Sequence, residues 1–236
     1  MWPFSKKYPI AVDGGPMSGY TDWHSHILPG VDDGVETLEE SIEILRAYED
    51  MGFAEVWFTP HIMEDIPNTT ADLRKRFDEL AAAYDGKLSL HLGAENMLDN
   101  LFEERLEARD LLPMGVNGDY MLVETSYFNP PHDMTGMLSR IQAAGFYPLL
   151  AHPERYMYMD NEDYQRLHAN GVKFQLNITS LAGAYGPVAE KKAHWLLNAG
   201  MYDYSGTDIH RYRSIEHLMR PCLNSKTMAR LKELTK

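Results

Sequence analysis

Histidines and carboxylates recur at short spacings along this chain. Near the N-terminus the run DWHSHILPGVDDG, residues 22–34, carries two histidines one residue apart and then Asp-Asp-Gly. A second pair, Asp208 and His210, is also one residue apart, in GTDIH. Strand side chains at i and i+2 point to the same face, so each pair could bind one metal ion. Imidazole and carboxylate ligands without thiolate favour Zn, Mn or Fe over a structural cysteine-type zinc.

Further candidate ligands each follow a short apolar run. They stand in the segments TPH, GAEN, YMLVETS and AHPERY. The full set of candidate metal ligands is His24, His26, Asp33, His61, Glu95, Glu124, His152, Asp208 and His210. Asp32 is interpreted as a residue that orders the turn, and Glu124 could instead pair with an arginine. A lone histidine would more often be a hydrogen-bonded core residue. The whole set is too large for one ion and is sufficient for two or three.

Short apolar runs alternate with amphipathic stretches along the chain. The runs are rich in Val, Leu, Phe, Tyr and Trp, which predicts strands over 19–26, 54–61, 88–95, 120–126, 147–154, 172–179 and 201–210. Apolar spacing and capping residues predict helices over 37–52, 68–86, 97–109, 133–145, 161–171, 187–200 and 214–235. This alternation predicts an α/β fold with parallel strands, in one barrel or near-barrel rather than two domains.

The predicted strands deliver polar residues to one rim. In a parallel barrel the active site lies at the C-terminal ends of the strands. The predicted strands end in His, Asp or Glu, except for the sixth, which ends in Asn177. We therefore expect the candidate ligands to form one metal centre at that rim.

Composition limits the classes of function. The net charge is −13 with a pI near 5.1, which argues against non-specific nucleic-acid binding. The single cysteine, Cys222, excludes a disulfide framework and fits a reducing compartment. The N-terminus lacks the apolar segment of a signal peptide, and no run is long enough to span a membrane. These features predict a cytoplasmic protein with a Gly/Pro-rich extended arm at 1–19 and a domain at 20–236; they do not indicate an oligomeric state.

A metal cluster of this kind suits phosphate-ester chemistry, because metal ions activate water and neutralise anionic oxygens. Arg155 stands three residues beyond His152 and could clamp phosphate oxygens, with a surface ion pair as the alternative. Cysteine-based phosphatase chemistry is excluded, because the sixth residue after Cys222 is Met rather than the required Arg. A serine triad has no Gly-x-Ser-x-Gly segment to support it.

Taken together, the motifs resemble the PHP (polymerase and histidinol phosphatase) superfamily. Within it, DWHSHILPGVDDG, TPH, GAEN, AHPERY and GTDIH are similar to the metal-dependent protein-tyrosine phosphatases of bacterial capsule and exopolysaccharide clusters, the CpsB/CapC type. The similarity runs from about residue 20 to 218. It implies a PHP-type distorted (β/α)7 barrel with a trinuclear centre, often of manganese, although Fe, Zn or Mg would also suit such ligands.

The resemblance also implies roles for individual residues. The three ligand sets that it implies are His24, His26, Glu95 and Asp208; Glu95, Glu124 and His152; and Asp33, His61 and His210. Arg155 matches the phosphate-binding arginine of the family, and Arg213 is preferred over Arg211 for a second arginine. The arm before Tyr20 is absent from short members, so no role is implied for it.

The activity implied by the resemblance is hydrolysis of phosphotyrosine in proteins. The implied substrate is a membrane tyrosine autokinase that regulates capsular polysaccharide synthesis and export. Aromatic residues of the rim loops that could line a tyrosine ring, or simply pack, are Tyr127, Phe128, Tyr156 and Tyr158. Two alternatives remain: a phosphoesterase for small-molecule phosphate monoesters, as in the histidinol-phosphatase branch, and a non-catalytic metal-binding module.

Overall fold

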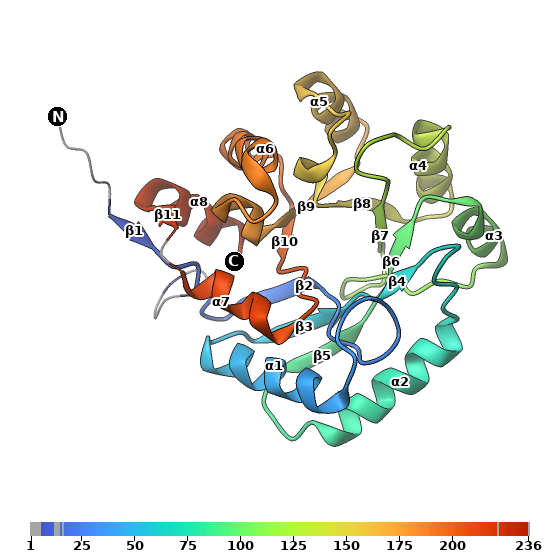
Figure 1. The fold of residues 1–236 in the computed structure, drawn as a ribbon. Coiled ribbons are helices and arrows are strands. Elements are labelled where there is room, and N and C mark those ends of the chain that lie inside the picture. The colour runs from blue at the N-terminus through green and yellow to red at the C-terminus, as the bar shows by residue number, and fades with distance from the viewer. Residues whose placement is uncertain (1–5, 12–14, 16, 221, 236) are drawn as a thin grey trace.

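Parallel strands form a curled wall at the centre of the molecule, and helices surround it (Figure 1). The computed structural model describes residues 6–11, 15, 17–220 and 222–235 of the chain. One sheet has the order β10-β9-β8-β7-β6-β4 and a second has the order β2-β3-β5, with every pairing parallel. The strands are β2 (Thr21–Ser25), β3 (Glu55–Phe58), β4 (His61–Ile62), β5 (Ser89–Leu92), β6 (Glu95–Met97), β7 (Tyr120–Glu124), β8 (Tyr147–Ala151), β9 (Lys173–Asn177) and β10 (Tyr204–Gly206). The predicted α/β class is confirmed.

Two of the seven predicted strands are broken in the middle. β3 and β4 are successive pieces of one strand, interrupted at 59–60, and β5 and β6 are interrupted at 93–94. Pro60 has no N–H to give to a strand ladder, which accounts for the first break. At the second break the ladder continues, because Gly93 N–H donates to the Phe58 carbonyl at 2.8 Å. The wall therefore has seven strand positions, as the sequence predicts.

The wall closes between its first and last strands. An isolated parallel bridge joins Ser25 to Ile209. Beside it, His26 N–H donates to the Ile209 carbonyl at 2.9 Å, and Asp208 N–H donates to the His24 carbonyl at 2.8 Å. These bonds hold the C-terminal ends of β2 and β10 together, so the closure of the barrel lies among the candidate ligands.

Helices cover the outside of the barrel and begin at capping residues. They are α1 (Leu38–Asp50), α2 (Thr70–Ala83), α3 (Asn100–Ala108), α4 (Met134–Ala143), α5 (Asn161–Ala169), α6 (Gly186–Ala199), α7 (Ile215–Met219) and α8 (Ser225–Leu234). The first five have Thr or Asp N-caps whose side chains accept from backbone N–H groups of the first turn. Among the described residues, no helix has both the length and the apolar composition needed to cross a membrane.

Large side chains fill the barrel below the rim. Trp57 packs with buried residues of β7 and β8 and stacks on Trp23 with ring centroids 5.7 Å apart. Trp23 also contacts Tyr204, at 4.3 Å between centroids. Each of these aromatic residues precedes a candidate ligand on the same strand segment. The candidate ligands therefore lie above a layer of packed aromatic side chains, which separates them from water at the other end of the barrel.

The N-terminal segment docks against the C-terminal part of the chain. β1 (Lys7–Tyr8) pairs antiparallel with β11 (Leu223–Asn224). Ala11 N–H donates to the Leu218 carbonyl at 2.9 Å, and the Ile10 side chain is completely buried. Residues 1–5, 12–14 and 16 of the predicted arm lie outside the described residues, and the domain boundary at 19/20 stays a prediction.

The prediction of one helix over 214–235 is wrong. The structure has two helices there, α7 and α8, separated by β11. Pro221 follows Arg220 in the sequence, and the residue before a proline is pushed out of the helical region. Arg220 is accordingly extended, with ψ of 134°.

Candidate metal centre

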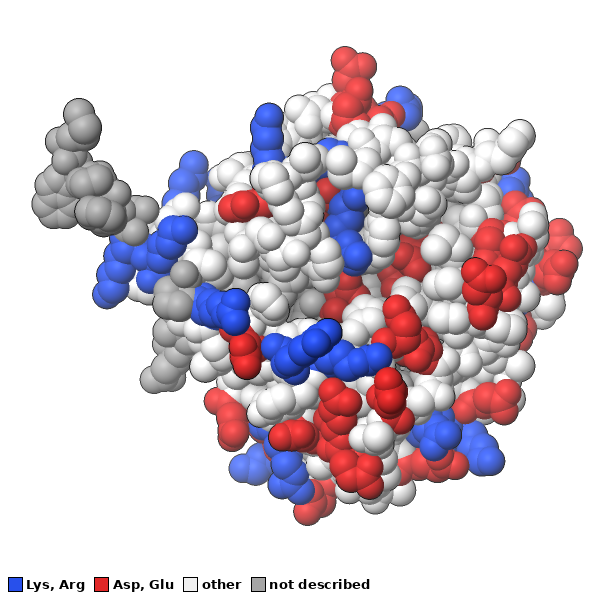
Figure 2. All heavy atoms as spheres, viewed as in Figure 1, with Lys and Arg blue, Asp and Glu red and all other residues white. Residues whose placement is uncertain are grey.

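The C-terminal ends of the strands bring the predicted ligands together. They fall into overlapping groups whose ligand atoms lie within 4.8 Å of one another. These groups are His24, His26 and Asp208; His24, Glu95 and His152; His61, Glu95 and Glu124; and His26, Asp33, His61 and His210. All are buried except His210, which is partly exposed, and Asp33, which is exposed. Figure 2 shows Asp and Glu atoms in a hollow near the middle of this face.

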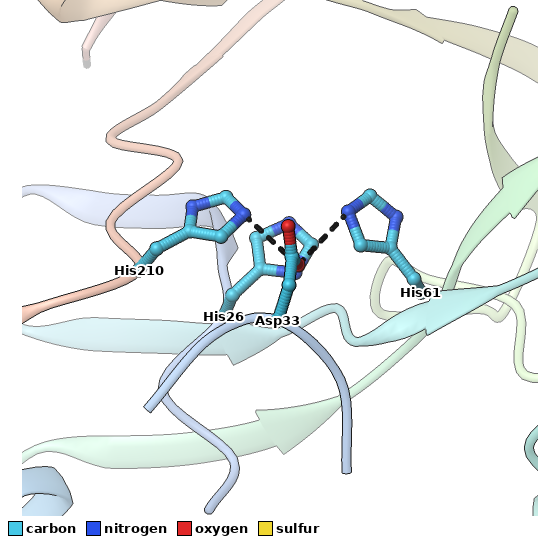
Figure 3. Close-up of side chains that lie close together, drawn as sticks. All are labelled: His26, Asp33, His61 and His210. Atoms are coloured by element: carbon cyan, nitrogen blue, oxygen red, sulfur yellow. Dashed lines mark ion pairs between the residues drawn. The ribbon is translucent and has the colours of Figure 1, made fainter. Parts of the chain in front are cut away.

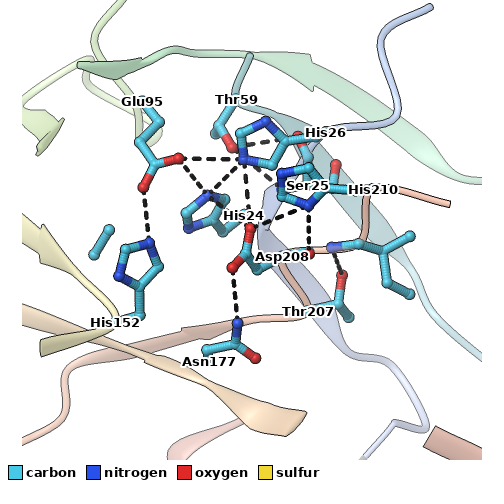
Figure 4. A network of polar contacts seen from close by, with 12 residues as sticks. His24, Ser25, His26, Thr59, Glu95, His152, Asn177, Thr207, Asp208 and His210 are labelled. Carbon is cyan, nitrogen blue, oxygen red and sulfur yellow. Dashed lines mark hydrogen bonds and ion pairs between the residues drawn. The ribbon is translucent and has the colours of Figure 1, made fainter. Parts of the chain in front are cut away.

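The inner part of the site is built around the two histidines of β2 (Figure 4). The Nε2 atoms of His24 and His26 lie 3.0 Å apart. Glu95 Oε2 lies 3.0 Å from the first and 3.2 Å from the second. Asp208 Oδ1 lies 3.6 and 3.5 Å from the same two atoms. Two imidazoles and two carboxylates thus point at one volume.

Hydrogen bonds on the far side of each ring fix the histidine tautomers. His24 Nδ1 lies 2.9 Å from Gln175 Oε1, and the amide of Gln175 is oriented by its own donation to the Leu176 carbonyl at 2.9 Å. His26 Nδ1 lies 2.7 Å from Asp32 Oδ2. Each Nδ1 therefore carries the proton, which leaves the Nε2 lone pairs directed at each other.

Opposed lone pairs at this distance require a positive charge. Burial lowers the pKa of His24, but the carboxylates of Glu95 and Asp208 outweigh burial and raise it to about 9. A proton can supply that charge, and so can a metal ion. Metal binding displaces the protons of such ligands. The donor set, its burial and the fixed tautomers all fit a divalent metal.

Glu95 occupies the centre of the cluster. Its Oε1 lies 3.0 Å from His152 Nε2, while its Oε2 faces the β2 histidines and lies 3.3 Å from His61 Nδ1. A carboxylate whose two oxygens face different imidazoles has the geometry of a bridging ligand. Buried histidines around Glu95 account for a pKa far below its usual range, against the opposing effect of burial.

Glu124 lies closer to His61 than to His152. Its Oε1 is 3.1 Å from His61 Nδ1, and its Oε2 is 3.9 Å from His152 Nε2. Among the described residues, no arginine forms an ion pair with Glu124, so the alternative of an arginine partner is wrong. The buried Nδ1 atoms of both His61 and His152 make no aligned hydrogen bond. An unsatisfied buried nitrogen is costly, and in His61 it is aimed at two carboxylates, which suits a ligand atom.

An outer group lies at the mouth of the site (Figure 3). Asp33 Oδ1 is 3.6 Å from His61 Nε2 and 3.5 Å from His210 Nε2. The hydrogen-bonding contact with His210 lowers the pKa of Asp33 to about 2. His26 belongs to this group as well as to the inner one. The group therefore has the three residues that the resemblance implies for a third ion, joined by His26.

Local backbone geometry aims these side chains. The register of β2 against β3 shifts between Asp22 and Ser25, beside the first ligand. His152 and Asp208 have positive φ values of 32° and 54°, which is unusual for residues other than glycine and is often seen at functional sites. At Gly34 a Cβ atom would stand 2.2 Å from the His26 carbonyl oxygen, so only glycine allows that turn.

Arg155 is held beside the inner group. Its Nη1 donates to Asp208 Oδ2 at 2.7 Å, and its guanidinium lies over the rings of Tyr127 and Tyr185, 4.3 and 4.1 Å from their centroids. Asn177 Nδ2 donates to the same carboxylate oxygen at 2.8 Å. Burial lowers the pKa of Arg155, but Asp208 outweighs it, so the guanidinium is permanently charged. Arg155 is thus a cation held in a fixed orientation beside the candidate metal centre.

The other predicted residues lie elsewhere. Arg213 is exposed in the short helix η3 (Tyr212–Ser214), and no contact between it and the ligands is recorded among the described residues, so its catalytic role stays a prediction. Tyr156 cannot line a substrate ring, because it is completely buried and donates to the Ala151 carbonyl at 3.0 Å. Phe128, in contrast, is 72% exposed.

A model of the family described as capsular polysaccharide synthesis, CpsB/CapC, matches residues 20–233. The chain belongs to the CpsB/CapC family. The resemblance drawn from the motifs is thereby confirmed.

Relatives named as tyrosine phosphatases align with most of the chain. Tyrosine-protein phosphatase YwqE of Bacillus subtilis is 28% identical over 199 residues, which span 82% of this chain and 78% of that protein. Tyrosine-protein phosphatase CpsB of Streptococcus agalactiae is 27% identical over 208 residues, spanning 80% and 82%. A structure described as that of metal-dependent tyrosine phosphatases, YwqE from Bacillus subtilis and CpsB from Streptococcus pneumoniae, matches 91% of this chain and 93% of its own, with 26% identity and a TM-score of 0.75. The predicted barrel fold is confirmed.

Sequence reasoning missed the residues that support the ligands. The sequence predicts that Asp32 orders its turn, and Asp32 does accept from Gly34 N–H at 2.9 Å. It also contacts His26 Nδ1 and accepts from His61 N–H at 3.0 Å. Gln175 is not among the predicted site residues, although a polar residue between two apolar ones in a predicted strand is a usable signal. Both contact the Nδ1 atom of a candidate ligand, on the side of the ring that faces away from the opposed Nε2 atoms.

Proposed function

We propose that this protein hydrolyses phosphotyrosine in proteins with a cluster of divalent metal ions, of which manganese is the expected one. The observation that carries the proposal is the pair of opposed Nε2 lone pairs of His24 and His26 inside a ring of carboxylates, with Arg155 preoriented beside it. The names of the relatives, tyrosine phosphatases, support the same activity.

The nine ligands would hold two or three ions, with Glu95 between them. When bound, such a cluster supplies Lewis acidity toward phosphoryl oxygens and lowers the pKa of water. The protein's own part is to fix the ligands: Asp32 and Gln175 keep the protons of His26 and His24 on Nδ1. The layer of aromatic side chains below the rim keeps bulk water from the buried side of the candidate metal centre.

Arg155 would bind the phosphoryl group. The structure records one hydrogen bond from its side chain to the described residues, from Nη1, and its side chain is 17% exposed. Its remaining N–H groups have no hydrogen bond recorded among the described residues and can bind a non-bridging oxygen, since a planar guanidinium matches phosphate geometry. The leaving phenolate has a parent pKa near 10, so it needs less proton donation than an alkoxide.

The mouth of the site favours an aromatic ester. Tyr127 and Tyr185 flank Arg155, and the exposed Phe128 follows the first of them. Rings at these positions could contact the ring of a phosphotyrosine. We propose that the physiological substrate is a membrane tyrosine autokinase of the polysaccharide export system and that the protein acts in the cytoplasm; membership of a capsular polysaccharide synthesis family supports this.

A substrate panel tests the proposal. Phosphate release is measured with Mn²⁺ from a phosphotyrosine peptide, a phosphoserine peptide and an alkyl monoester such as histidinol phosphate. We expect clear preference for the phosphotyrosine peptide and no turnover after chelation. Preference for the alkyl ester would assign the site to small-molecule phosphates, and no turnover of any ester with metal bound would identify a binding module.

A further inference from the structure

The charge of this acidic chain is divided unevenly along the sequence. Residues 1–19 and 209–236 together contain nine Lys or Arg and three Asp or Glu. The remaining residues contain 13 Lys or Arg and 32 Asp or Glu. The two ends therefore carry a net charge of +6, and the rest of the chain carries −19.

The fold places these two basic ends side by side. β1 pairs with β11, and Cys222 N–H donates to the Tyr8 carbonyl at 3.0 Å. Ala11 N–H is bonded to the end of α7 through the Leu218 carbonyl. Charges that stand at opposite ends of the sequence are therefore concentrated on one side of the barrel.

This side leads to the metal centre. His210 is followed at once by Arg211, which donates to the His210 carbonyl at 2.8 Å, and then by Arg213 in η3. Figure 2 shows Lys and Arg atoms over β1 and α7 and beside the central hollow. We call this set the basic flank; its members are Lys6, Lys7, Arg211, Arg213 and Arg220.

Acidic neighbours offset only part of the charge of the basic flank. Arg211 Nη2 lies 3.6 Å from Glu36 Oε1, and Arg220 Nη2 lies 3.2 Å from Glu216 Oε2. All four side chains of these pairs are a third or more exposed, and exposed pairs are weak. Lys6, Lys7 and Arg213 have no ion pair among the described residues. The basic flank is thus available to an anionic partner.

We propose that the basic flank binds an acidic segment of the substrate protein, adjacent in sequence to the phosphotyrosine in the metal centre. This rests on the proposed function and adds a determinant of substrate choice to it. Residues 20–208 carry a formal charge of −19, part of it on buried carboxylates such as Asp22, Glu95 and Asp208. The exposed carboxylates among them repel an acidic protein from other directions, so the flank also orients its approach. An extended chain spans about 33 Å in ten residues, so the acidic positions of a test peptide are placed within ten residues of the phosphotyrosine.

The experiment compares pairs of peptides of about 20 residues that have a phosphotyrosine at the centre. In each pair, four positions on one side of the phosphotyrosine are Glu in one peptide and Gln in the other. kcat/KM is measured with Mn²⁺ for wild type and for Lys6→Glu/Lys7→Glu. The matched control is Arg74→Glu/Lys75→Glu on α2, which changes the net charge equally in exposed residues away from the flank. A second variant, Arg220→Gln, removes one charge without adding an acid beside Glu216.

For wild type we expect the peptide with four Glu residues, on the side that reaches the flank, to have a kcat/KM at least about threefold higher than the matching peptide with four Gln residues. This difference should disappear at about 0.5 M salt, which screens exposed charges. Lys6→Glu/Lys7→Glu should abolish or reverse the preference, and Arg220→Gln should weaken it. The control variant should keep it, and all variants should turn over p-nitrophenyl phosphate like wild type.

Turnover of all aryl phosphates without any preference for Glu peptides would overturn the inference and leave the proposed function standing. Loss of all turnover in wild type would instead contradict the proposed function. Binding to phosphatidylglycerol vesicles that depends on Lys6 and Lys7, with no preference among peptides, would also overturn the inference, because the basic flank would then serve a membrane surface.

Discussion

His24 and His26 direct their Nε2 atoms at each other across 3.0 Å, and both rings have their Nδ1 protons committed to other residues. Two buried lone pairs at that distance repel unless a cation lies close to both. The carboxylates of Glu95 and Asp208 reach the same volume. The arrangement is therefore unfavourable unless a proton or a metal ion supplies a positive charge there.

The Asp32→Asn substitution should weaken metal binding. The carboxylate of Asp32 holds the His26 ring and increases its basicity, and an amide supplies neither the charge nor a fixed acceptor. We expect a loss of about 10- to 100-fold in affinity for Mn²⁺, measured by titration calorimetry on metal-free protein. Asp65→Asn, an exposed carboxylate close in sequence to β4, is the control. Equal affinities for both variants would show that Asp32 only orders its turn.

The Arg155→Lys substitution should not preserve activity. Lysine keeps the charge but cannot fill the space between the Tyr127 and Tyr185 rings or present a planar pair of donors to phosphate. We expect kcat/KM for phosphotyrosine peptides to fall by at least about tenfold, with metal content unchanged. Arg166→Lys on α5 serves as the control. If Arg155→Lys were as active as wild type, the positive charge of this residue would be sufficient and its planar guanidinium would have no role.

The convergence of the candidate ligands could be predicted from the sequence, because most of them end an apolar run and parallel strands of a barrel deliver their C-terminal residues to one rim. Asp33 is the exception, since it lies in the loop after β2. Asp32 and Gln175 could not be assigned in this way. Their roles depend on which side of a particular imidazole they meet, and that is set by the turn at Gly34 and by packing across the barrel.

The docking of the arm could not be predicted from the sequence pattern, whereas the break in the last predicted helix has a signal in the sequence. A two-residue strand such as β1 has no periodicity to detect, and it exists only because β11 is present to pair with it. Pro221 was a usable signal for the break after Arg220, but the apolar spacing on both sides favoured one helix. Arg213 shows the limit of assignment by motif position, since its exposed place in η3 does not decide its role.

The Asp22→Ala substitution should destabilise the fold without removing a candidate ligand side chain, although Asp22 also accepts from His24 N–H at 3.2 Å. Asp22 is buried and accepts from Thr207 N–H at 2.8 Å, from the Thr207 hydroxyl at 2.7 Å and from the Tyr48 hydroxyl at 2.9 Å, so it ties β2 to β10 and α1. Burial raises its pKa to about 6 against these hydrogen bonds. We expect a loss of about 3 kcal/mol in the free energy of unfolding.

Thermal and urea unfolding of metal-free protein measure this loss. Tyr48→Phe removes one donor and leaves the others, so it should cost only about 1 kcal/mol. If Asp22→Ala were as stable as Tyr48→Phe, the tie between β2 and β10 would not contribute to folding.

Thiol chemistry should be irrelevant to turnover. Cys222 lies next to β11 and is half-buried, and burial raises the pKa of its thiol. We expect Cys222→Ser and iodoacetamide-treated protein to keep activity within about twofold of wild type, because an unactivated thiol is a poor nucleophile. Inactivation by iodoacetamide that Cys222→Ser prevents, at unchanged metal content, would contradict a purely metal-based site.

Titration of metal-free protein with Mn²⁺ tests the metal centre most directly, with bound metal and phosphotyrosine hydrolysis followed on the same samples. We expect activity to rise with two or three ions per chain, and His152→Ala to lose at least one ion and about 100-fold or more in kcat/KM. His168→Ala on α5 should match wild type in both. Full hydrolysis by metal-free protein, or His152→Ala with normal metal content and normal turnover, would contradict a metal-dependent phosphatase built on these ligands.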